Sequence, residues 1–510
     1  MKASRYVLYV SIGLIVLLTP LAAFAHTKVV RSIPSAGEKL TISPREVVVW
    51  SRDPLVARFS LVTVLDASGA IVSKRPVISQ DRRQFTLPVG TLPPGNYTVN
   101  WRLVSAVDGH TTWGGFTFTL QETSKASLVL KASRSRKGAN VRTVARAQGV
   151  LAPALKPMDQ PPPNAIANTF LAVVRWIGFL AAFVLVGSAT FEACVLRPGM
   201  AALRSSSTWL SGEAAATRLR ALTLDAAAGL LLILAVEAIY GAAGLINATL
   251  PRLVTSGALS EYLVATRPGW SILLQASLAL LLLVARSSAS RTAHAYARPL
   301  AAAWMPSGVG ALLLSGFSLA SHAARNGPLE AIADWAHLFA ASLWIGGLTS
   351  LLVVLSAAPR TDRSEVARAL VPRFSTVAGI SLGALILTGV FMTILEVPAV
   401  RAFTTTVYGR VLLVKILIFA PLAVLGALNR FFLVSRIRRA ASTSILKNFL
   451  WTAKAEVILA GLVLAVVAVL VATPPANVTT YTSGVPGARP FIGNEPGTVT
   501  TRPVGTQRAR

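Results

Sequence analysis

The sequence predicts a two-part membrane protein, in which an N-terminal all-β sandwich of the immunoglobulin or cupredoxin kind precedes an all-α bundle of about eight transmembrane helices. Hydrophobic residues make up 53% of the 510-residue chain and charged residues only 14%, whereas soluble domains carry about 25% charged residues. Short alternating runs separated by turn signals occupy the first part of the chain, and long apolar runs occupy the rest. This pattern excludes a plain cytosolic enzyme and a disordered protein.

The sandwich prediction rests on four alternating runs, each long enough for a strand. They cover residues 46–50, 58–65, 97–103 and 115–120. Turn sequences such as Pro93-Pro94-Gly95-Asn96 separate these runs, as expected for a sandwich of short strands. Cys194 is the single cysteine, so an intrachain disulfide and a thiolate metal cluster are both excluded.

The composition divides the chain into five segments. A basic start, an apolar run and Ala23-Phe24-Ala25 predict a secretory signal that is cleaved after Ala25. A linker follows the sandwich and contains eight Lys and Arg residues before three consecutive prolines. The predicted segments are a signal peptide at 1–25, the sandwich at 26–120, the linker at 121–163, the transmembrane region at 164–472 and a Pro/Gly-rich tail at 473–510.

Eight apolar runs have the length of about 20 residues that a helix needs to cross a bilayer. They lie near 169–192, 222–247, 269–285, 301–321, 333–357, 374–396, 409–433 and 450–472, and the third is the shortest. With the sandwich outside, the cytoplasmic loops hold fifteen Arg and Lys residues and the opposite loops hold four. The positive-inside rule therefore predicts a multi-pass protein of the cell (inner) membrane, with the sandwich and the C-terminal tail extracytoplasmic.

The net charge of +29 comes from 49 Lys and Arg residues against 20 Asp and Glu residues. Nucleic-acid binding is one explanation of such an excess. Basic cytoplasmic loops and a basic linker explain it better, so we expect the lipid bilayer as a partner and no nucleic acid.

A candidate metal site outside the membrane combines His26 with Asp108 and His110. Cleavage after Ala25 makes His26 the first residue, so that its α-amine and its imidazole can chelate one metal ion together. Residues two apart on a strand point to one face, so Asp108 and His110 can add a carboxylate and a second imidazole. Such a set of nitrogen and oxygen ligands suits Cu(II). The alternative is that His26 is an ordinary surface residue.

The sandwich region resembles the CopC copper-binding domain. The resemblance lies in residues 26–37, in residues 93–102, and in Asp108-Gly109-His110 with the Gly114–Phe118 run behind it. It implies a β-sandwich that binds Cu(II) through His26, Asp108 and His110. The chain departs from the family pattern in two places: it reads Trp50-Ser51-Arg52-Asp53-Pro54 where members often have a Phe-Ser-Glu-Pro-like run, and residues 26–120 contain no methionine. Because Cu(I) prefers soft thioether ligands, we expect a site for Cu(II) alone.

A second candidate site lies at the extracytoplasmic end of the bundle. His322 ends the fourth predicted span and His337 lies one turn into the fifth. Asp334 is three residues before His337 and therefore shares its helix face. Met392 and Glu396 fall at a similar depth on the sixth span. These five side chains are candidates for receiving copper, as Cu(I) or Cu(II), and wetted histidines at helix ends are the alternative.

Four ionisable residues lie deeper within the spans, namely Arg175, Glu237, Lys415 and Glu456. A charged side chain at a helix centre costs about 2.5–3.5 kcal/mol on insertion scales. We therefore expect these residues to face the bundle interior or to pair, with Arg175 or Lys415 as the partner of Glu237. A role for Glu237 as a carboxylate on a cation pathway is the alternative.

The membrane region resembles the CopD copper-resistance family. The resemblance lies in Ser321-His322-Ala323-Ala324, in the run from Asp334 to Leu348, and in Arg373-Phe374-Ser375. The whole chain is therefore similar to a CopC–CopD fusion, as in bacterial copper-uptake proteins of the YcnJ type. The resemblance implies capture of Cu(II) outside the cell membrane and copper transport, inward by family analogy, in copper homeostasis or resistance.

Three other functions remain open from the sequence. The protein could be a membrane redox protein with His322 and His337 as haem ligands, a copper-buffering resistance factor without transport, or an oxidative enzyme built on the N-terminal histidine. Asp108 argues against the last because it occupies a position that oxygen activation needs. No ATP-binding or phosphorylation motif is present, so we expect no ATPase and no enzyme, with a periplasmic copper chaperone or reductase as a further partner.

Overall fold

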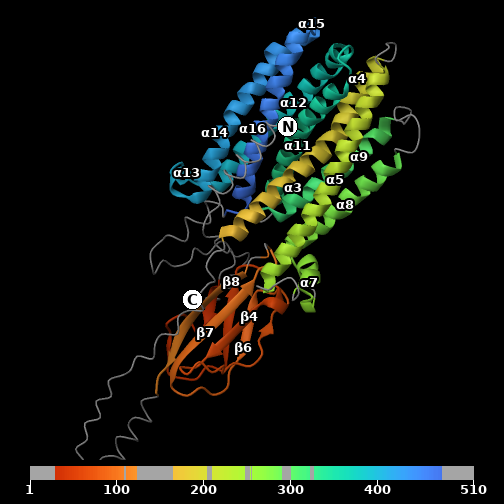
Figure 1. The fold of residues 1–510 in the computed structure, drawn as a ribbon. Coiled ribbons are helices and arrows are strands. Elements are labelled where there is room, and N and C mark those ends of the chain that lie inside the picture. Colours follow the sequence, from red (N-terminus) through yellow and green to blue (C-terminus); the bar gives the residue numbers. More distant parts are fainter. Residues whose placement is uncertain are drawn as a thin grey trace, which may run out of the picture.

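The computed structural model describes residues 29–107, 109, 111–122, 165–203, 209–246, 253, 255–289, 300–321 and 327–473. A β domain lies at one end of a bundle of long helices (Figure 1). The predicted signal peptide, the C-terminal tail except its first residue and all of the linker after its first two residues lie outside the described residues. So do four predicted ligands, His26, Asp108, His110 and His322.

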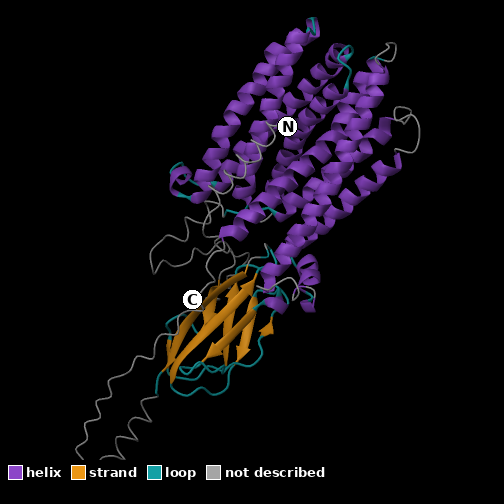
Figure 2. Cartoon of the chain, in the orientation of Figure 1, coloured by secondary structure: helices purple, strands orange, loops and turns teal. Residues whose placement is uncertain are grey.

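The β domain is a sandwich of two four-stranded sheets (Figure 2). One sheet has the order β1-β3-β6-β5 and the other β2-β8-β7-β4, and all neighbours are antiparallel except β2 and β8. The strands are β1 (Val29–Ile33), β2 (Lys39–Leu40), β3 (Glu46–Ser51), β4 (Leu61–Leu65), β5 (Val77–Ile78), β6 (Gln84–Pro88), β7 (Gly95–Val104) and β8 (Thr111–Leu120). The predicted all-β class is confirmed.

Alternating apolar residues fill the space between the sheets. Val47 and Val49 of β3, Phe85 of β6, and Val62 and Val64 of β4 are at most 1% exposed. Because successive side chains on a strand point to opposite faces, this spacing turns one face of each strand inward.

One predicted strand begins later than expected. Residues Ala57–Phe59 form a short 3₁₀ helix, η1, and strand β4 begins at Leu61. The turn is closed by backbone hydrogen bonds from Phe59 and Ser60 to the carbonyl of Val56. The apolar alternation before Leu61 therefore belongs to a turn and not to the sheet.

All eight predicted spans are helical. They are α3 (Ala165–Phe191), α5 (Trp209–Ile246), α8 (Arg267–Ala289), α9 (Leu300–Ala320), α11 (Pro328–Ala357), α12 (Arg363–Glu396), α14 (Val407–Leu428) and α16 (Thr443–Val471). Within the described residues, seven helices are long and apolar enough to cross a membrane. The exception is the fourth span, α9, whose apolar part Trp304–Ala320 is shorter, whereas the third span, predicted to be the shortest, meets the criterion.

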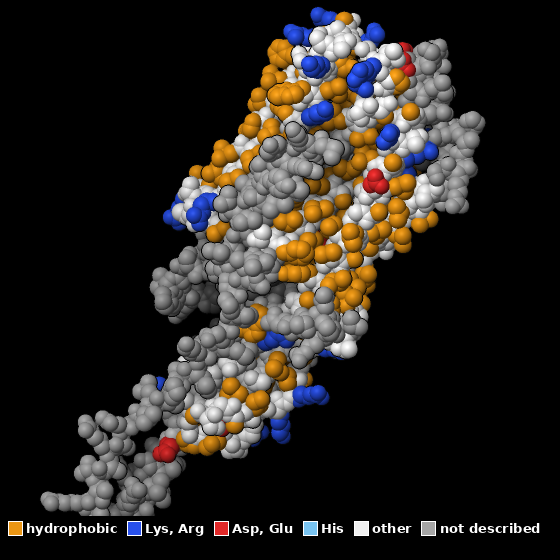
Figure 3. Space-filling model, viewed as in Figure 1, with side chains coloured by type: hydrophobic (Ala, Val, Ile, Leu, Met, Phe, Trp, Pro, Cys, Tyr) orange, Lys and Arg blue, Asp and Glu red, His pale blue; other side chains and the backbone are white. Residues whose placement is uncertain are grey.

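Short elements extend or connect these helices. They are the π-helical turn η2 (Glu192–Leu196), α4 (Arg197–Ala202), α7 (Ala258–Ala265), α13 (Ala402–Thr405), the π-helical turn η3 (Asn429–Leu433) and α15 (Val434–Arg439). Lys and Arg side chains gather at the end of the bundle that carries α4 and α15 and lies away from the β domain (Figure 3). This asymmetry is the one on which the predicted orientation rests.

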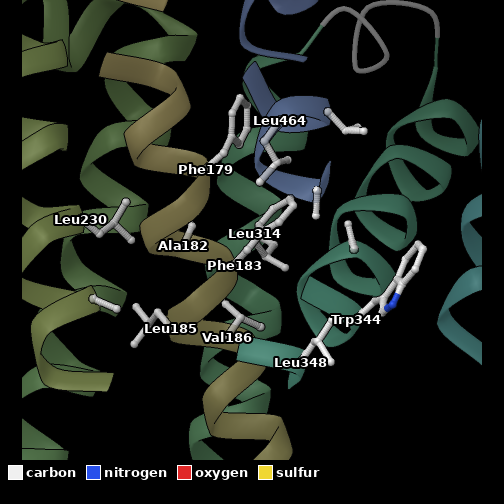
Figure 4. Close-up of a cluster of buried hydrophobic side chains, with 14 of the residues drawn as sticks. Phe179, Ala182, Phe183, Leu185, Val186, Leu230, Leu314, Trp344, Leu348 and Leu464 are labelled. Carbon is white, nitrogen blue, oxygen red and sulfur yellow. The ribbon is translucent and has the colours of Figure 1, made fainter. Parts of the chain in front are cut away.

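Helix α3 is the central helix of the bundle. Its side chains pack against residues from α5, α9, α11 and α16 (Figure 4). The buried residues at this centre include Phe183, Val186, Leu230, Leu314, Trp344, Leu348 and Leu464. Lipid tails are as apolar as these side chains, so close packing holds such helices together.

The closest approach in this core joins α3 and α11 at two glycines. A Cβ added to Gly187 would lie 2.6 Å from the Cα of Gly346, and a Cβ added to Gly346 would lie 2.9 Å from the Cα of Gly187. Backbone atoms meet there, so neither helix can yield by rotating a side chain. The two glycines therefore set the distance between α3 and α11.

Replacing Gly187 by alanine is expected to force these helices apart and to lower the free energy of unfolding by about 1–3 kcal/mol. The measurement is thermal unfolding of the purified protein in detergent. Gly229→Ala in α5 is the control, because nothing lies within 4 Å of its added Cβ. Equal melting temperatures for Gly187→Ala and the wild type would contradict the close approach of α3 and α11 at these glycines.

A buried ion pair fastens α3 to α8 near the basic end of the bundle. Glu192 accepts hydrogen bonds from Arg286 and, at 3.2 Å, from Nη2 of Arg197. The side chains of Glu192 and Arg286 are each only 9% exposed. Removing one member of a buried pair leaves an uncompensated charge in an apolar interior.

Arg286→Met is therefore expected to cost about 3–5 kcal/mol of stability. Arg218→Met, which changes an exposed arginine of α5, serves as the matched control. Thermal unfolding in detergent measures both, and an Arg286→Met protein as stable as the control would show that Arg197 alone satisfies Glu192.

Candidate metal centre

The sandwich is docked directly on the bundle. Arg58 donates a hydrogen bond of 3.0 Å to the carbonyl of Ser256, and the backbone N–H of Arg267 donates one of 2.9 Å to the carbonyl of Ala106. Val56 and Val104 of the sandwich belong to the same apolar cluster as the buried residues of the bundle. These contacts place the sandwich over α7 and the adjoining ends of α5 and α8 (Figure 1).

Arg102 adds a further contact at this interface. Its guanidinium donates to the carbonyl of Leu245, in the last turn of α5, where a helix presents unpaired carbonyl oxygens and a partial negative charge. Burial lowers the pKa of Arg102 from its usual value. An arginine nevertheless remains charged in proteins, so the contact stays a charge-assisted one.

The predicted Cu(II) ligands Asp108 and His110 lie outside the described residues, but the glycine between them is described. Gly109 has φ of 71° and donates a backbone hydrogen bond of 2.9 Å to Ser105. A Cβ added to Gly109 would lie 3.2 Å from Cε2 of Tyr262 in α7. Gly109, between β7 and β8, therefore lies against α7.

The described candidates inside the bundle lie at the same end as the sandwich. Asp334 and His337 lie within the first three turns of α11, which begins where α9 ends. Asp334 accepts a hydrogen bond of 2.8 Å from the hydroxyl of Ser318 in α9. Nδ1 of His337 lies 2.8 Å from the hydroxyl oxygen of Thr388 in α12. Three helices thus meet around the two predicted residues.

The hydrogen bonds of Thr388 decide which nitrogen of His337 carries the proton. The Thr388 hydroxyl lies 2.6 Å from the carbonyl of Ala384 and donates its single hydrogen there. It can then only accept from His337, so Nδ1 carries the proton. This leaves the lone pair of the imidazole on Nε2, the arrangement that orients a metal-binding histidine.

The other candidates of the bundle have different partners. Glu396 accepts a hydrogen bond from the hydroxyl of Tyr408, which is 5% exposed. Lys415 of α14 lies within electrostatic range of Asp334, His337 and Glu396. Two carboxyl groups and one ammonium group therefore lie within electrostatic range of one another, which leaves a net negative charge when both carboxyl groups are ionised.

The sequence offers Arg175 or Lys415 as the partner of Glu237, and no ion pair of Glu237 with either occurs among the described residues. Arg175 of α3 lies within electrostatic range of Glu237 in α5, whereas Lys415 interacts with Asp334 and Glu396. Sequence reasoning identified Lys415 as a buried ionisable residue but missed its partners. It also missed Thr388 and Tyr408, which hydrogen-bond His337 and Glu396. The only sequence signal for these two residues is their spacing on helix faces.

The predicted five-residue ligand set stays a prediction, because His322 lies outside the described residues. No group of three or more His, Cys, Asp or Glu side chains able to hold a metal ion occurs in this part of the chain. Met392 follows Thr388 by one turn of α12 and precedes Glu396 by another, so the three share a helix face. The described residues therefore provide one imidazole nitrogen with a free lone pair, Nε2 of His337, near the charged groups of Asp334, Glu396 and Lys415.

The fold and these residues define a class: a membrane helix bundle with polar side chains at one end and a β-sandwich docked over that end. Comparison with known families assigns both parts. Residues 29–121 match the CopC domain, and residues 368–470 match copper resistance protein D, or CopD. The chain therefore belongs to the proteins that join a CopC domain to a CopD region, and the predicted resemblance is confirmed.

Two curated relatives cover different shares of the chain. The copper transport protein CutJ of Bacillus subtilis (strain 168) is 25% identical over 448 residues, which is 87% of this chain and 74% of that protein. Protein YobA of Escherichia coli (strain K12) is 31% identical over 108 residues, which is 21% of this chain and 86% of that protein.

Solved structures match the sandwich region. CopC from Methylosinus trichosporium OB3b is 29% identical and covers 19% of this chain and 95% of its own, with a TM-score of 0.18. PcoC from Escherichia coli, titled a methionine-rich copper resistance protein, is 26% identical and covers 19% of this chain and 100% of its own, also with a TM-score of 0.18.

The protonation of His337 can be tested directly. In ¹⁵N-histidine-labelled protein, the resonances that His337→Gln removes are expected to show a protonated Nδ1 and an unprotonated Nε2. Thr388→Val removes the acceptor and is expected to mix the two tautomers, whereas Thr393→Val, whose hydroxyl bonds the carbonyl of Gly389, leaves them unchanged. A protonated Nε2 in the wild type would contradict the assignment.

Proposed function

We propose that this protein captures Cu(II) outside the cell membrane and passes copper through its helix bundle to the cytoplasm. The observation that carries the proposal is the direct docking of a CopC domain on the end of the bundle that holds His337, Asp334 and Glu396. A relative that aligns with most of the chain is named a copper transport protein, which supports transport rather than simple buffering.

The capture site in this proposal consists of His26, Asp108 and His110. Gly109 lies against Tyr262, so a metal ion held by the residues on either side of that glycine would lie close to the bundle. A short distance between capture and entry favours transfer of the ion without release into bulk solvent.

The entry site in this proposal uses Nε2 of His337, with His322 and the thioether of Met392 as further ligands. Lys415 partly balances Asp334 and Glu396, and the remaining negative charge attracts a cation into the bundle. The protein acts here as a carrier and not as an enzyme, and a periplasmic copper chaperone or reductase would supply the ion.

Uptake of radioactive copper by cells tests transport and its direction. Deletion of the protein is expected to reduce the initial rate of copper accumulation, and reintroduction of the wild-type chain to restore it. Equal rates in deletion and wild-type cells would refute transport. A higher copper content in the deletion strain would reverse the proposed direction.

The capture site makes a separate prediction. His26→Ala and Asp108→Ala are each expected to weaken Cu(II) binding to the purified protein by at least tenfold, because each removes one ligand. His294→Ala changes a histidine outside the proposed site and serves as the control. Competition with a copper-chelating dye measures the affinity, and N-terminal sequencing establishes whether the mature chain starts at His26. Unchanged affinity in both variants would refute the capture site.

A further inference from the structure

A second polar site lies about midway along the bundle, around Glu456. This glutamate is in the middle of α16 and is only 4% exposed. Its Oε1 atom accepts a hydrogen bond from the side-chain amide of Asn429, and the indole of Trp344 lies beside its carboxyl group. The site is thus built from three segments, α11, η3 and α16.

The amide of Asn429 is held in one orientation. Its Oδ1 atom accepts a hydrogen bond of 2.7 Å from the hydroxyl of Thr452, which lies one turn before Glu456. With the oxygen occupied, the NH₂ group faces the carboxylate. Asn429 is also the first residue of the π-helical turn η3, and such turns within α-helices are frequent at functional sites.

A glycine keeps space beside the carboxyl group. A Cβ added to Gly426 of α14 would lie 3.2 Å from Cζ2 of Trp344 and 3.7 Å from Oε2 of Glu456. A side chain at this position would press on the indole ring and approach the carboxyl oxygen. The absence of one leaves Trp344 in place beside Glu456.

The groups that act on Glu456 are neutral. The ion pairs found among the described residues use Arg58, Arg197 and Arg286, and none of them includes Glu456. The nearest cation in sequence on the facing segment, Arg430, donates instead to the carbonyl of Ser375 in α12.

Two further cations on helices packed against α16 act on other groups. Arg175 of α3 acts on Glu237, and Lys415 of α14 acts on Asp334, His337 and Glu396. Lys454 of α16 itself is exposed on the outer face of the helix. A carboxylate at Glu456 would therefore be a buried negative charge without a cation in the described bundle.

The site is aligned with the proposed entry site. Trp344 follows His337 by seven residues on α11, which is two helical turns along the same face, or about 10 Å. The Glu456 carboxyl group, which lies beside Trp344, is therefore about two helical turns from His337 toward the basic end of the bundle.

We propose that Glu456 is a proton-binding group and that its proton is taken up and released as copper moves through the bundle. An apolar interior disfavours an uncompensated carboxylate, and binding one proton from water forms an O–H bond on that carboxylate and removes the charge. The return of the proton to water restores the charge, so no oxidant or reductant is involved. The proton-binding site stands independently, whereas the coupling to copper rests on the proposed function.

Infrared difference spectroscopy of the purified full-length protein tests proton binding. A pH titration is expected to show the C=O stretch of a protonated carboxyl group, which Glu456→Gln removes and Glu456→Asp shifts. Glu365→Gln changes a glutamate in the first turn of α12, next to the aqueous phase, and is the matched control that keeps the band. Identical titrations of the wild type and Glu456→Gln would overturn the proton-binding site.

Copper uptake into liposomes containing the protein tests coupling. An imposed pH difference is expected to change the uptake rate of the wild type severalfold and to leave the rate of Glu456→Gln unchanged. Coupling would be refuted if the uptake rate of the wild type did not change with the pH difference, or if the uptake rate of Glu456→Gln did change with it. A wild type that moves no copper while the infrared band titrates would refute the proposed transport and leave the proton site in place.

Discussion

The low polarity of the bilayer interior is the constraint on which the structure of the bundle depends. Within it, water cannot satisfy a buried polar group, so each group needs a partner from a neighbouring helix. Glu192 meets Arg286, Asp334 meets Ser318, and the imidazole of His337 meets Thr388. Each pairing also joins two helices, so the polar contacts of the bundle fix its helix neighbours as well as its chemistry.

The same constraint gives different consequences at different depths. Glu192 lies near the basic end and has two arginine partners, which suits a fixed structural role. Glu456 lies about midway and has one neutral donor, the amide of Asn429, with the indole of Trp344 beside it. Neutral donors hold a carboxyl group in place but do not remove its charge, so Glu456 can respond to the arrival of a cation in a way that Glu192 cannot.

The docked sandwich adds a second level of organisation. A CopC domain on a long linker could lie anywhere above the membrane, yet Arg58, Arg102 and the backbone of Arg267 join it to the ends of the helices. Some of these contacts are made to main-chain carbonyl groups at a helix end or in a connecting segment, where the backbone provides no hydrogen-bond partner of its own. They place the segment around Gly109 against α7, so that capture and entry would occur on one face of the protein.

Apolar length and alternation were sufficient to predict the two architectures, because eight runs of transmembrane length and a few alternating strands have simple periodicities. The same signals underestimated the lengths of the helices. Helix α5 begins at Trp209 and α12 at Arg363, well before their predicted apolar runs, because helices continue into water where hydropathy no longer marks them. The short helix α7 and strands β1, β2, β5 and β6 were missed, and β2 and β5 have only two residues each to carry a pattern.

The sequence by itself determined which side chains are available: the ionisable residues within the spans, the histidines at their ends and the motifs of the two families. Only the tertiary structure decided their partners. It placed Arg175 within electrostatic range of Glu237 and Lys415 within electrostatic range of Asp334 and Glu396, and it brought Asn429 and Trp344 to Glu456. The physical reason is that helix periodicity specifies the face on which a residue lies, whereas the neighbour of that face depends on how helices distant in sequence pack.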